Sequence, residues 1–363
     1  MTRRKVGMIF IAIIGALVAG LSTAWLVSPD VRYLTRAGAE ESQILASKRP
    51  IAKMVADSSL DPALRARLQL VLDARNYAAT LGFAAANTYT SYADVKRDTL
   101  LLVISASPPD CLCPFTWKYP IVGRMPYKGF FDLKMARKEA AKLEKKGYDV
   151  YLRPSGAFST LGWFDDPLLS TAVEGDTVEL VATVFHEISH NTLYVKSATP
   201  FNESFAQLAG YRAAEQFFRS RGDSAAARYA ADRWHDEVVL GGYYTVLAGR
   251  LDTLYRGSKG DSAALAEGRT TISAWARAAL QDTIGPQLRT YQVGKLPERP
   301  VNNARIIAAR IYRTRLDLLE AWYQAHGQDI STSVSELRTL MKGAEGDSAE
   351  ARLETAVAAP HPE

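Results

Sequence analysis

Phe185-His186-Glu187-Ile188-Ser189-His190 is the stretch that most strongly decides the fold of this chain. Apolar residues recur at helical spacing from Val178 through this stretch, which predicts a helix buried on most sides. Residues four apart lie on one face of a helix, so His186 and His190 can direct two imidazole nitrogens at one point. Two histidines and one further ligand are a donor set of zinc hydrolases, in which a fourth position is left for water. The spacing therefore predicts a metal site on a buried helix.

Glu203 is the expected third ligand. Pro200 is favoured in a first helical turn, so Glu203 should lie near the start of the next helix, which can return antiparallel to the first. Glu187 points about 100° away from His186 around the helix and cannot easily reach the same metal. It can reach a water at the metal, where a carboxylate is a suitable general base and then a general acid.

Composition limits the other classes of function. The 363 residues include 44 basic and 39 acidic side chains, for a net charge of +5, and can bury a sizeable core. We find no basic stripe with interleaved aromatics, so no nucleic-acid partner is expected. Cys111 and Cys113 are the only cysteines, and we expect either two thiols or a local bridge without a catalytic role.

The N-terminus predicts a membrane segment. Arg3, Arg4 and Lys5 precede an uncharged apolar run from Gly7 to Val27, which is long enough to span a bilayer. A cleaved signal peptide is the alternative, with small residues at Ser22–Ala24 for cleavage. We therefore expect residues 1–28 to be a transmembrane anchor or signal segment that contacts inner-membrane lipid. The rest would lie on the periplasmic face of the inner membrane or, after cleavage, free in the periplasm.

The remaining chain predicts an α+β fold that is mostly α. A small mixed sheet should come first, followed by a helical catalytic region from Asp176 onward. The expected strands lie at 99–105 and 148–153, with an extended segment at 119–127. The expected helices lie at 29–45, 61–80, 132–146, 224–256, 262–283, 302–326 and 331–342. The tail at 343–363 is expected to be disordered.

Several separated motifs carry a family resemblance. They are Pro126–Asp132, Ser159–Leu168, the metal segment with Leu193–Lys196, Phe201–Ala206 and Asn302–Arg305. Together they resemble the bacterial predicted aminopeptidases, a zinc-dependent family of the gluzincin clan. The resemblance implies a zincin-like, gluzincin-like metallopeptidase domain over 29–342, with one zinc ion held by His186, His190 and Glu203.

The chain departs from that family in two ways. Many members look like lipoproteins with a cysteine after the signal segment, whereas Leu21 stands here, so no lipid anchor can form at that point. Thermolysin-like gluzincins also carry an aspartate four residues after the metal glutamate. Gln207 occupies that position, so either Gln207 or another residue must orient the ligand histidine.

Peptide hydrolysis also needs a donor for the developing oxyanion, and we select Tyr312. Tyr312 lies two turns after Asn303 and Ala304, in a segment that carries the resemblance. The other candidates are the aromatic donors His235, Tyr243, Tyr244 and Tyr255.

Substrate binding is predicted for the segment before the metal helix. Asp165 and Asp166 can bind a free substrate ammonium, although an Asp-Asp-Pro turn would also explain them. Gly156 and Ala157 can offer an edge strand to the peptide backbone.

The residues themselves predict a zinc-dependent hydrolase with Glu187 as general base and acid, and the resemblance implies that it is an aminopeptidase that acts on peptides. Two alternatives stay open: a zinc endopeptidase acting on extended or unfolded chains, and a zinc-stabilised binding protein without turnover.

Overall fold

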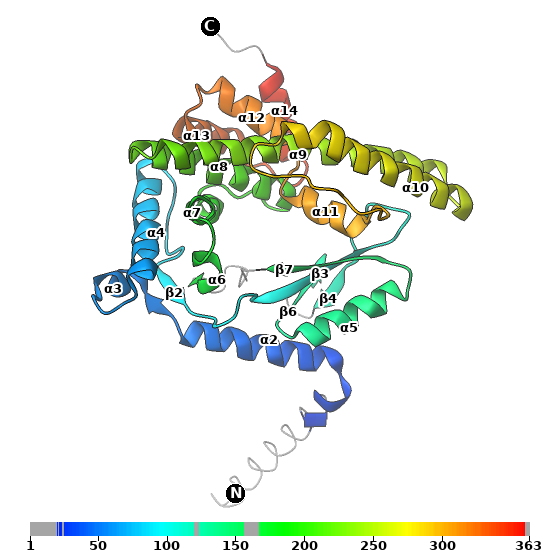
Figure 1. Cartoon of the computed structure of the whole chain (residues 1–363), viewed down its shortest axis with the longest axis horizontal. Helices are drawn as coiled ribbons and strands as arrows, with labels where there is room; N and C mark the ends of the chain where they lie inside the picture. The colour runs from blue at the N-terminus through cyan, green and yellow to red at the C-terminus, as the bar shows by residue number, and fades with distance from the viewer. Residues whose placement is uncertain (1–19, 21, 24, 120–122, 156–166, 360–363) are drawn as a thin grey trace, which may run out of the picture.

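The computed structural model describes residues 20–359, except 21, 24, 120–122 and 156–166, and helices form most of this part (Figure 1). The α-helices are α2 (Pro29–Ala46), α3 (Ile51–Ala56), α4 (Pro62–Thr80), α5 (Leu133–Glu144), α6 (Ser170–Val173), α7 (Thr177–Thr192), α8 (Thr199–Ser220), α9 (Ser224–Gly257), α10 (Ser262–Ala278), α11 (Asn303–Ile311), α12 (Leu316–Ala325), α13 (Ile330–Leu340) and α14 (Ser348–Ala358). A π-helical turn (Ala279–Ile284) and a 3-10 turn (Gly285–Gln287) continue α10.

The described strands form three small sheets. Their bounds are β1 (Arg49–Pro50), β2 (Ser91–Ala93), β3 (Leu101–Ser107), β4 (Trp117–Tyr119), β5 (Gly123–Met125), β6 (Tyr127–Phe130), β7 (Asp149–Ser155) and β8 (Leu168–Leu169). The sheet orders are β1-β2-β8, β6-β3-β7 and β4-β5. The strands expected at 99–105 and 148–153 are confirmed as β3 and β7. The small mixed sheet expected from these two strands is not found there, because β3 pairs antiparallel with both β6 and β7. Only β2 and β8 pair in parallel, and the extended segment at 119–127 contributes to β4, β5 and β6.

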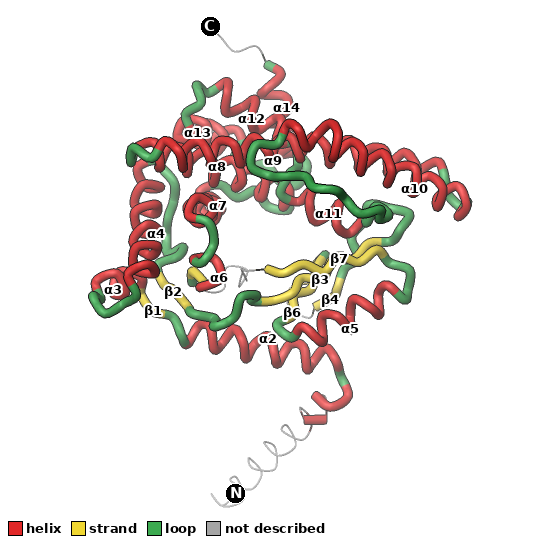
Figure 2. Tube along the Cα trace, in the orientation of Figure 1, coloured by secondary structure: helices red, strands yellow, loops and turns green. Residues whose placement is uncertain are grey.

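The sheet β6-β3-β7 is covered differently on its two faces. On one face, Ile104 and Ala106 of β3 pack with Ala136 and Ala140 of α5. Tyr33 of α2 meets Phe130 edge to face on the same side, at 5.1 Å between ring centroids. Helix α11 contacts β3 and β7 on the other side, so the sheet lies between α2 and α5 below and α11 above (Figure 2). The face of the sheet toward α11 is therefore not part of the hydrophobic cluster formed with α5.

Helix α7 lies in the main hydrophobic core, among α4, α8 and α9 (Figure 1). The side chain of Asp176 accepts hydrogen bonds from the backbone N–H groups of Val178 and Glu179, at 2.8 and 3.1 Å, and so caps the helix. Phe185 and Ile188 are fully buried. Fully burying such an apolar side chain contributes about 1.5–3 kcal/mol, so the helix that carries the histidines is firmly held.

The membrane prediction is corrected. Most of the segment from Gly7 to Val27 lies outside the described residues. Among the described residues, no helix is both long and apolar enough to cross a membrane. The expected transmembrane helix, its lipid contact and the membrane location that depended on it are therefore not supported.

Two helix predictions are also corrected. The expected helix at 302–326 divides into α11 and α12, because Arg315 adopts a left-handed conformation with φ of +50°. The tail at 343–363 is not disordered as a whole, because α14 forms within it. Ala349 and Leu353, four residues apart, are buried in the main core. This apolar stripe gives α14 a surface that packs against the core. The disorder prediction missed it because glycines and prolines flank the helix in the sequence.

Candidate functional site

The predicted ligands converge where α7 faces the first turn of α8. Nε2 of His186 lies 3.4 Å from Oε2 of Glu203, and Nε2 of His190 lies 3.9 Å from Oε1 of the same carboxylate. One donor atom from each of the three residues lies within 4.8 Å of the other two. Each side chain is partly buried, with exposed fractions of 13%, 24% and 21% for His186, His190 and Glu203. These three residues can hold a metal ion.

The turn between α7 and α8 is fixed by Asn202, the residue before Glu203. Its side-chain oxygen accepts a hydrogen bond from the backbone N–H of Val195, and its side-chain nitrogen donates to the carbonyl of Val195, each at 2.8 Å. Asn202 is only 2% exposed, so these two bonds also satisfy its buried amide. The Asn-Glu pair in the sequence is thus explained: the asparagine fixes the loop and the glutamate faces the histidines.

Gly210 lets the two helices approach each other. A Cβ atom at this position would lie 2.8 Å from the backbone oxygen of Ala182 and 3.4 Å from Cβ of His186. Gly210 follows Glu203 by two helical turns, and Ala182 precedes His186 by one turn, so they lie on the helix faces that carry Glu203 and His186. The absence of a side chain at Gly210 therefore keeps Glu203 close to the histidines.

The substitution Gly210→Ala is expected to lower the free energy of unfolding by about 1–3 kcal/mol, because a backbone oxygen cannot move away as a side chain can. It should also weaken metal binding by separating α7 from α8. Chemical denaturation and metal titration measure the two effects. Gly249→Ala on α9 is the matched control, because nothing lies within 4 Å of its added Cβ. Equal effects of the two substitutions would contradict this account of Gly210.

The protonation states suit metal binding. Burial and the neighbouring His186 lower the pKa of His190 to about 4, against the opposing effect of Glu203. Burial alone would raise the pKa of Glu203, but a hydrogen bond from His186 and the charges of both histidines outweigh it and lower this pKa. Near neutral pH, His190 is therefore neutral and Glu203 ionised, which are the forms that ligate metals.

Tyr312, at the end of α11, lies beside the histidines. Its ring centroid is 6.4 Å from that of His186. Burial, followed by the charge of Glu203, raises the pKa of Tyr312 to about 12, and Glu187 contributes in the same direction. The phenol therefore keeps its proton at neutral pH and can donate a hydrogen bond.

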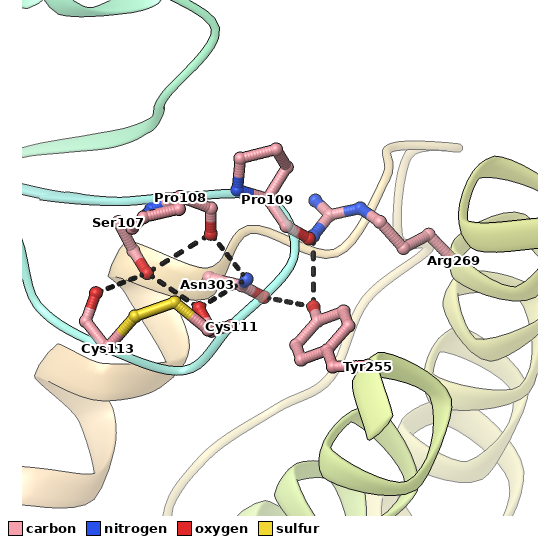
Figure 3. Close-up of a disulfide and its surroundings, with 8 residues drawn as sticks. All are labelled: Ser107, Pro108, Pro109, Cys111, Cys113, Tyr255, Arg269 and Asn303. Atoms are coloured by element: carbon pink, nitrogen blue, oxygen red, sulfur yellow. Dashed lines mark hydrogen bonds between the residues drawn. A yellow bond between two sulfur atoms is a disulfide. The ribbon is translucent and has the colours of Figure 1, made fainter. Parts of the chain in front are cut away.

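Asn303 anchors the N-terminal end of α11. Its side-chain nitrogen donates to the carbonyls of Pro108 and Cys111, at 2.9 and 3.0 Å, and its side-chain oxygen accepts a hydrogen bond from the Tyr255 hydroxyl at 2.7 Å (Figure 3). Cys111 forms a disulfide with Cys113, so of the two alternatives for these cysteines the local bridge is the one found. The loop after β3 is thereby joined to α11.

Two contacts hold the other end of α11. Arg313 forms an ion pair with Glu237 of α9, with 2.7 Å between Nε and Oε2, and Glu237 is only 2% exposed. The backbone N–H of Thr314 donates to the hydroxyl of Ser204, at 3.0 Å. Ser204 directly follows Glu203, so the segment next to Tyr312 is tied to the helix that carries the predicted third ligand.

The other candidate oxyanion donors make contacts of their own. Nε2 of His235 lies 3.1 Å from the carbonyl oxygen of Gln287, and the Tyr243 hydroxyl donates to the carbonyl of Ala276. The Tyr255 hydroxyl is bonded to Asn303, as described above. Tyr244 packs against Tyr243, at 5.2 Å between ring centroids. Of the five, Tyr312 is the one with a ring contact to a predicted ligand.

Some predicted positions lie outside the described residues. Gly156, Ala157, Asp165 and Asp166 belong to the residues that the structure does not describe. Gln207 is among the described residues, and within them it makes no hydrogen bond to His186 or His190.

Comparison with known proteins now gives the family. A sequence model of the family described as "Putative aminopeptidase" matches residues 32–353. The chain belongs to this family. No curated protein and no solved structure shows a significant match. The family description indicates an aminopeptidase, and hence peptide substrates, in general terms, which confirms the resemblance at that level.

In this member of the family, two residues that interact electrostatically with the site were not predicted: Tyr127, on which the charge of Glu203 acts, and Arg153, whose charge acts on Tyr312. Tyr127 belongs to the Pro126–Asp132 motif, and Arg153 ends the alternating stretch from Tyr148. The alternation shows that Tyr151 and Arg153 share one face of a strand. It gives no information about which helix covers that face, so these residues could not be assigned to the site.

Proposed function

We propose that this protein is a zinc-dependent aminopeptidase of the gluzincin type. The observation that carries the proposal is the convergence of His186, His190 and Glu203, with Glu187 on the same helix and Tyr312 beside them. Membership of an aminopeptidase family supports the direction of cleavage.

The donor set fits zinc. Tetrahedral zinc with ligands at 2.0–2.2 Å has ligand atoms about 3.4 Å apart, close to the 3.4 and 3.9 Å between the histidine nitrogens and the Glu203 oxygens. Two imidazoles and one carboxylate also leave a coordination position for a water. When bound, zinc would lower the pKa of this water and polarise the peptide carbonyl.

Two side chains would carry the remaining steps. Glu187 would take a proton from the attacking water and deliver it to the leaving nitrogen as the peptide bond breaks. The Tyr312 hydroxyl, protonated and partly buried, would donate a hydrogen bond to the oxygen on which negative charge develops.

The substitution Tyr312→Phe is expected to lower kcat by about 10²- to 10³-fold, the effect of losing one oxyanion donor. Zinc content and KM should change little, because the ring and its packing stay. Steady-state kinetics with metal analysis measure both. Tyr194→Phe, at a tyrosine that is 66% exposed, is the control and should keep full activity. Unchanged kcat in Tyr312→Phe would remove this residue from the mechanism.

Paired peptides test the proposed function. The zinc-supplemented protein is incubated with a short peptide and with the same peptide acetylated at its amino terminus. We expect hydrolysis of the free peptide, one residue at a time from its amino terminus, and none of the acetylated peptide. Internal cleavage of the acetylated peptide would identify an endopeptidase instead. Absence of cleavage of a broad set of both kinds would contradict a peptidase.

A further inference from the structure

Arg153 lies near the C-terminal end of β7, on the face of the sheet opposite to α5. Val150 and Leu152 of β7 pack in the cluster around α5. Arg153 alternates with these residues and pairs with Val103 of β3, so its side chain points to the other face. Strand β7 is an edge of the sheet β6-β3-β7, which places Arg153 at a margin of the sheet.

Helix α11 lies on that face and runs in the same direction as β7. The backbone N–H of Asn303 donates to Asp149 at 2.7 Å, and the Arg305 guanidinium lies 5.8 Å from the ring centroid of Tyr151. From Asn303, nine helical residues advance about 13 Å to Tyr312. From Asp149, four strand residues also advance about 13 Å, to Arg153. Tyr312 and Arg153 therefore come to the same level.

Electrostatic effects agree with this placement. The charge of Arg153 opposes the upward shift that burial and Glu203 impose on the pKa of Tyr312. It has the same effect on Tyr127, whose pKa is raised by burial and by Glu203 although 40% of its surface is exposed. Arg153 thus lies within electrostatic reach of both tyrosines, on which Glu203 also acts.

Arg153 is partly buried and has no carboxylate partner among the described residues, in contrast to four other buried or partly buried arginines. The paired arginines are Arg212 with Glu320, Arg233 with Glu179, Arg269 with Asp149 and Arg313 with Glu237. A guanidinium binds a carboxylate through two parallel hydrogen bonds, and such charged pairs are stronger than neutral ones. No described residue forms such a carboxylate pair with the Arg153 guanidinium.

We propose that Arg153 binds a carboxylate of the peptide substrate beside the metal ligands. The preferred substrates would then be peptides with a carboxylate close to the cleaved bond. This carboxylate is either the C-terminal carboxylate of a short peptide or the side chain of an acidic residue. The inference rests on the proposed peptidase function and specifies its substrate class.

Equilibrium binding tests the inference without turnover. Isothermal titration of the zinc-loaded Glu187→Gln protein uses three probes: Ala-Ala, its C-terminal amide, and Ala-Glu with an amidated C-terminus. We expect the best carboxylate-bearing probe to bind about 10- to 100-fold more tightly than Ala-Ala amide. If Ala-Ala is the tighter one, the C-terminal carboxylate is the ligand. If amidated Ala-Glu is the tighter one, the acidic side chain is.

Variants of Arg153 identify the group responsible. In the Glu187→Gln background, Arg153→Met should bring the ratio of affinities for the carboxylate-bearing probe and for Ala-Ala amide close to one. Arg153→Lys should restore part of this ratio, because lysine supplies the positive charge but cannot form two parallel hydrogen bonds to a carboxylate. Arg137→Met, at an exposed arginine of α5, should leave the ratio intact. Circular dichroism checks that each variant is folded.

Three results would overturn the inference: no measurable binding of either carboxylate-bearing probe, equal affinity for all three probes, or an equal loss for acid and amide in Arg153→Met. The last result would mean that Arg153 has a structural role. The proposed function is tested separately, by peptide hydrolysis with the wild-type protein, whereas the inference about Arg153 is tested by binding alone. A protein that binds carboxylate peptides through Arg153 but cleaves none would retain this inference and lose that function.

Discussion

Replacing Glu187 with glutamine is expected to lower kcat/KM for peptide hydrolysis by about 10²- to 10⁴-fold while zinc stays bound. Glutamine has nearly the same shape but cannot accept the proton of the attacking water. Glu187 is not among the three groups that converge as ligands, so the metal site should stay intact. Steady-state kinetics with a free-amino-terminus peptide, combined with metal analysis of the same sample, measure both quantities.

Glu174→Gln serves as the matched control. Glu174 is exposed at the end of α6, just before α7, so its substitution should leave activity unchanged. A Glu187→Gln protein with zinc bound and full activity would show that Glu187 is not the general base. A variant that loses its zinc would instead place Glu187 among the ligands.

His186→Ala is expected to weaken zinc binding by more than about 100-fold. Replacing a residue that only orients a ligand weakens metal binding by up to about 100-fold, and removing the ligand itself should cost more. Activity should fall with zinc occupancy, because two ligands cannot complete the site. Competition with a chelator of known affinity measures the change. Circular dichroism separates loss of metal from loss of fold.

His235→Ala provides the comparison for this experiment. The His235 ring contacts the carbonyl oxygen of Gln287 and is not part of the ligand group. Its substitution should leave zinc affinity unchanged. Equal zinc affinity of the wild type and His186→Ala would contradict the ligand assignment.

The ligand helix could be predicted because its signals are local. Asp176 marks the start of α7, the apolar spacing marks its burial, and the spacing of His186 and His190 places both on one face. Glu203 was predictable for a similar reason, since Pro200 marks the start of α8. Local capping and periodicity thus specify most of the candidate metal site.

The surroundings of the site depend on contacts between distant segments. Tyr312 could be selected from a motif, but its place beside His186 requires the contacts of Asn303, Arg313 and Thr314 at the two ends of α11. Arg153 belongs to this surface only because β7 pairs with β3 and α11 covers one face. Pairing and packing of this kind leave no sign in a local window of sequence.

The wrong predictions have similar origins. The break between α11 and α12 lies at the left-handed Arg315, next to Thr314, whose backbone N–H donates to Ser204, a residue far away in the chain. Helix α14 gains its stability from the burial of Ala349 and Leu353 against other helices. The membrane prediction rested on the apolar length of residues 7–27 and on the basic residues before them, and no described helix supports it.

Zinc stoichiometry tests the central claim most directly. The purified wild-type chain is incubated with zinc, freed of excess metal by gel filtration and analysed for zinc and protein. The convergence of His186, His190 and Glu203 predicts about one tightly bound zinc ion per chain, lost in His186→Ala and kept in His235→Ala. A wild-type chain that retains no zinc, or one whose zinc survives in His186→Ala, would contradict the account.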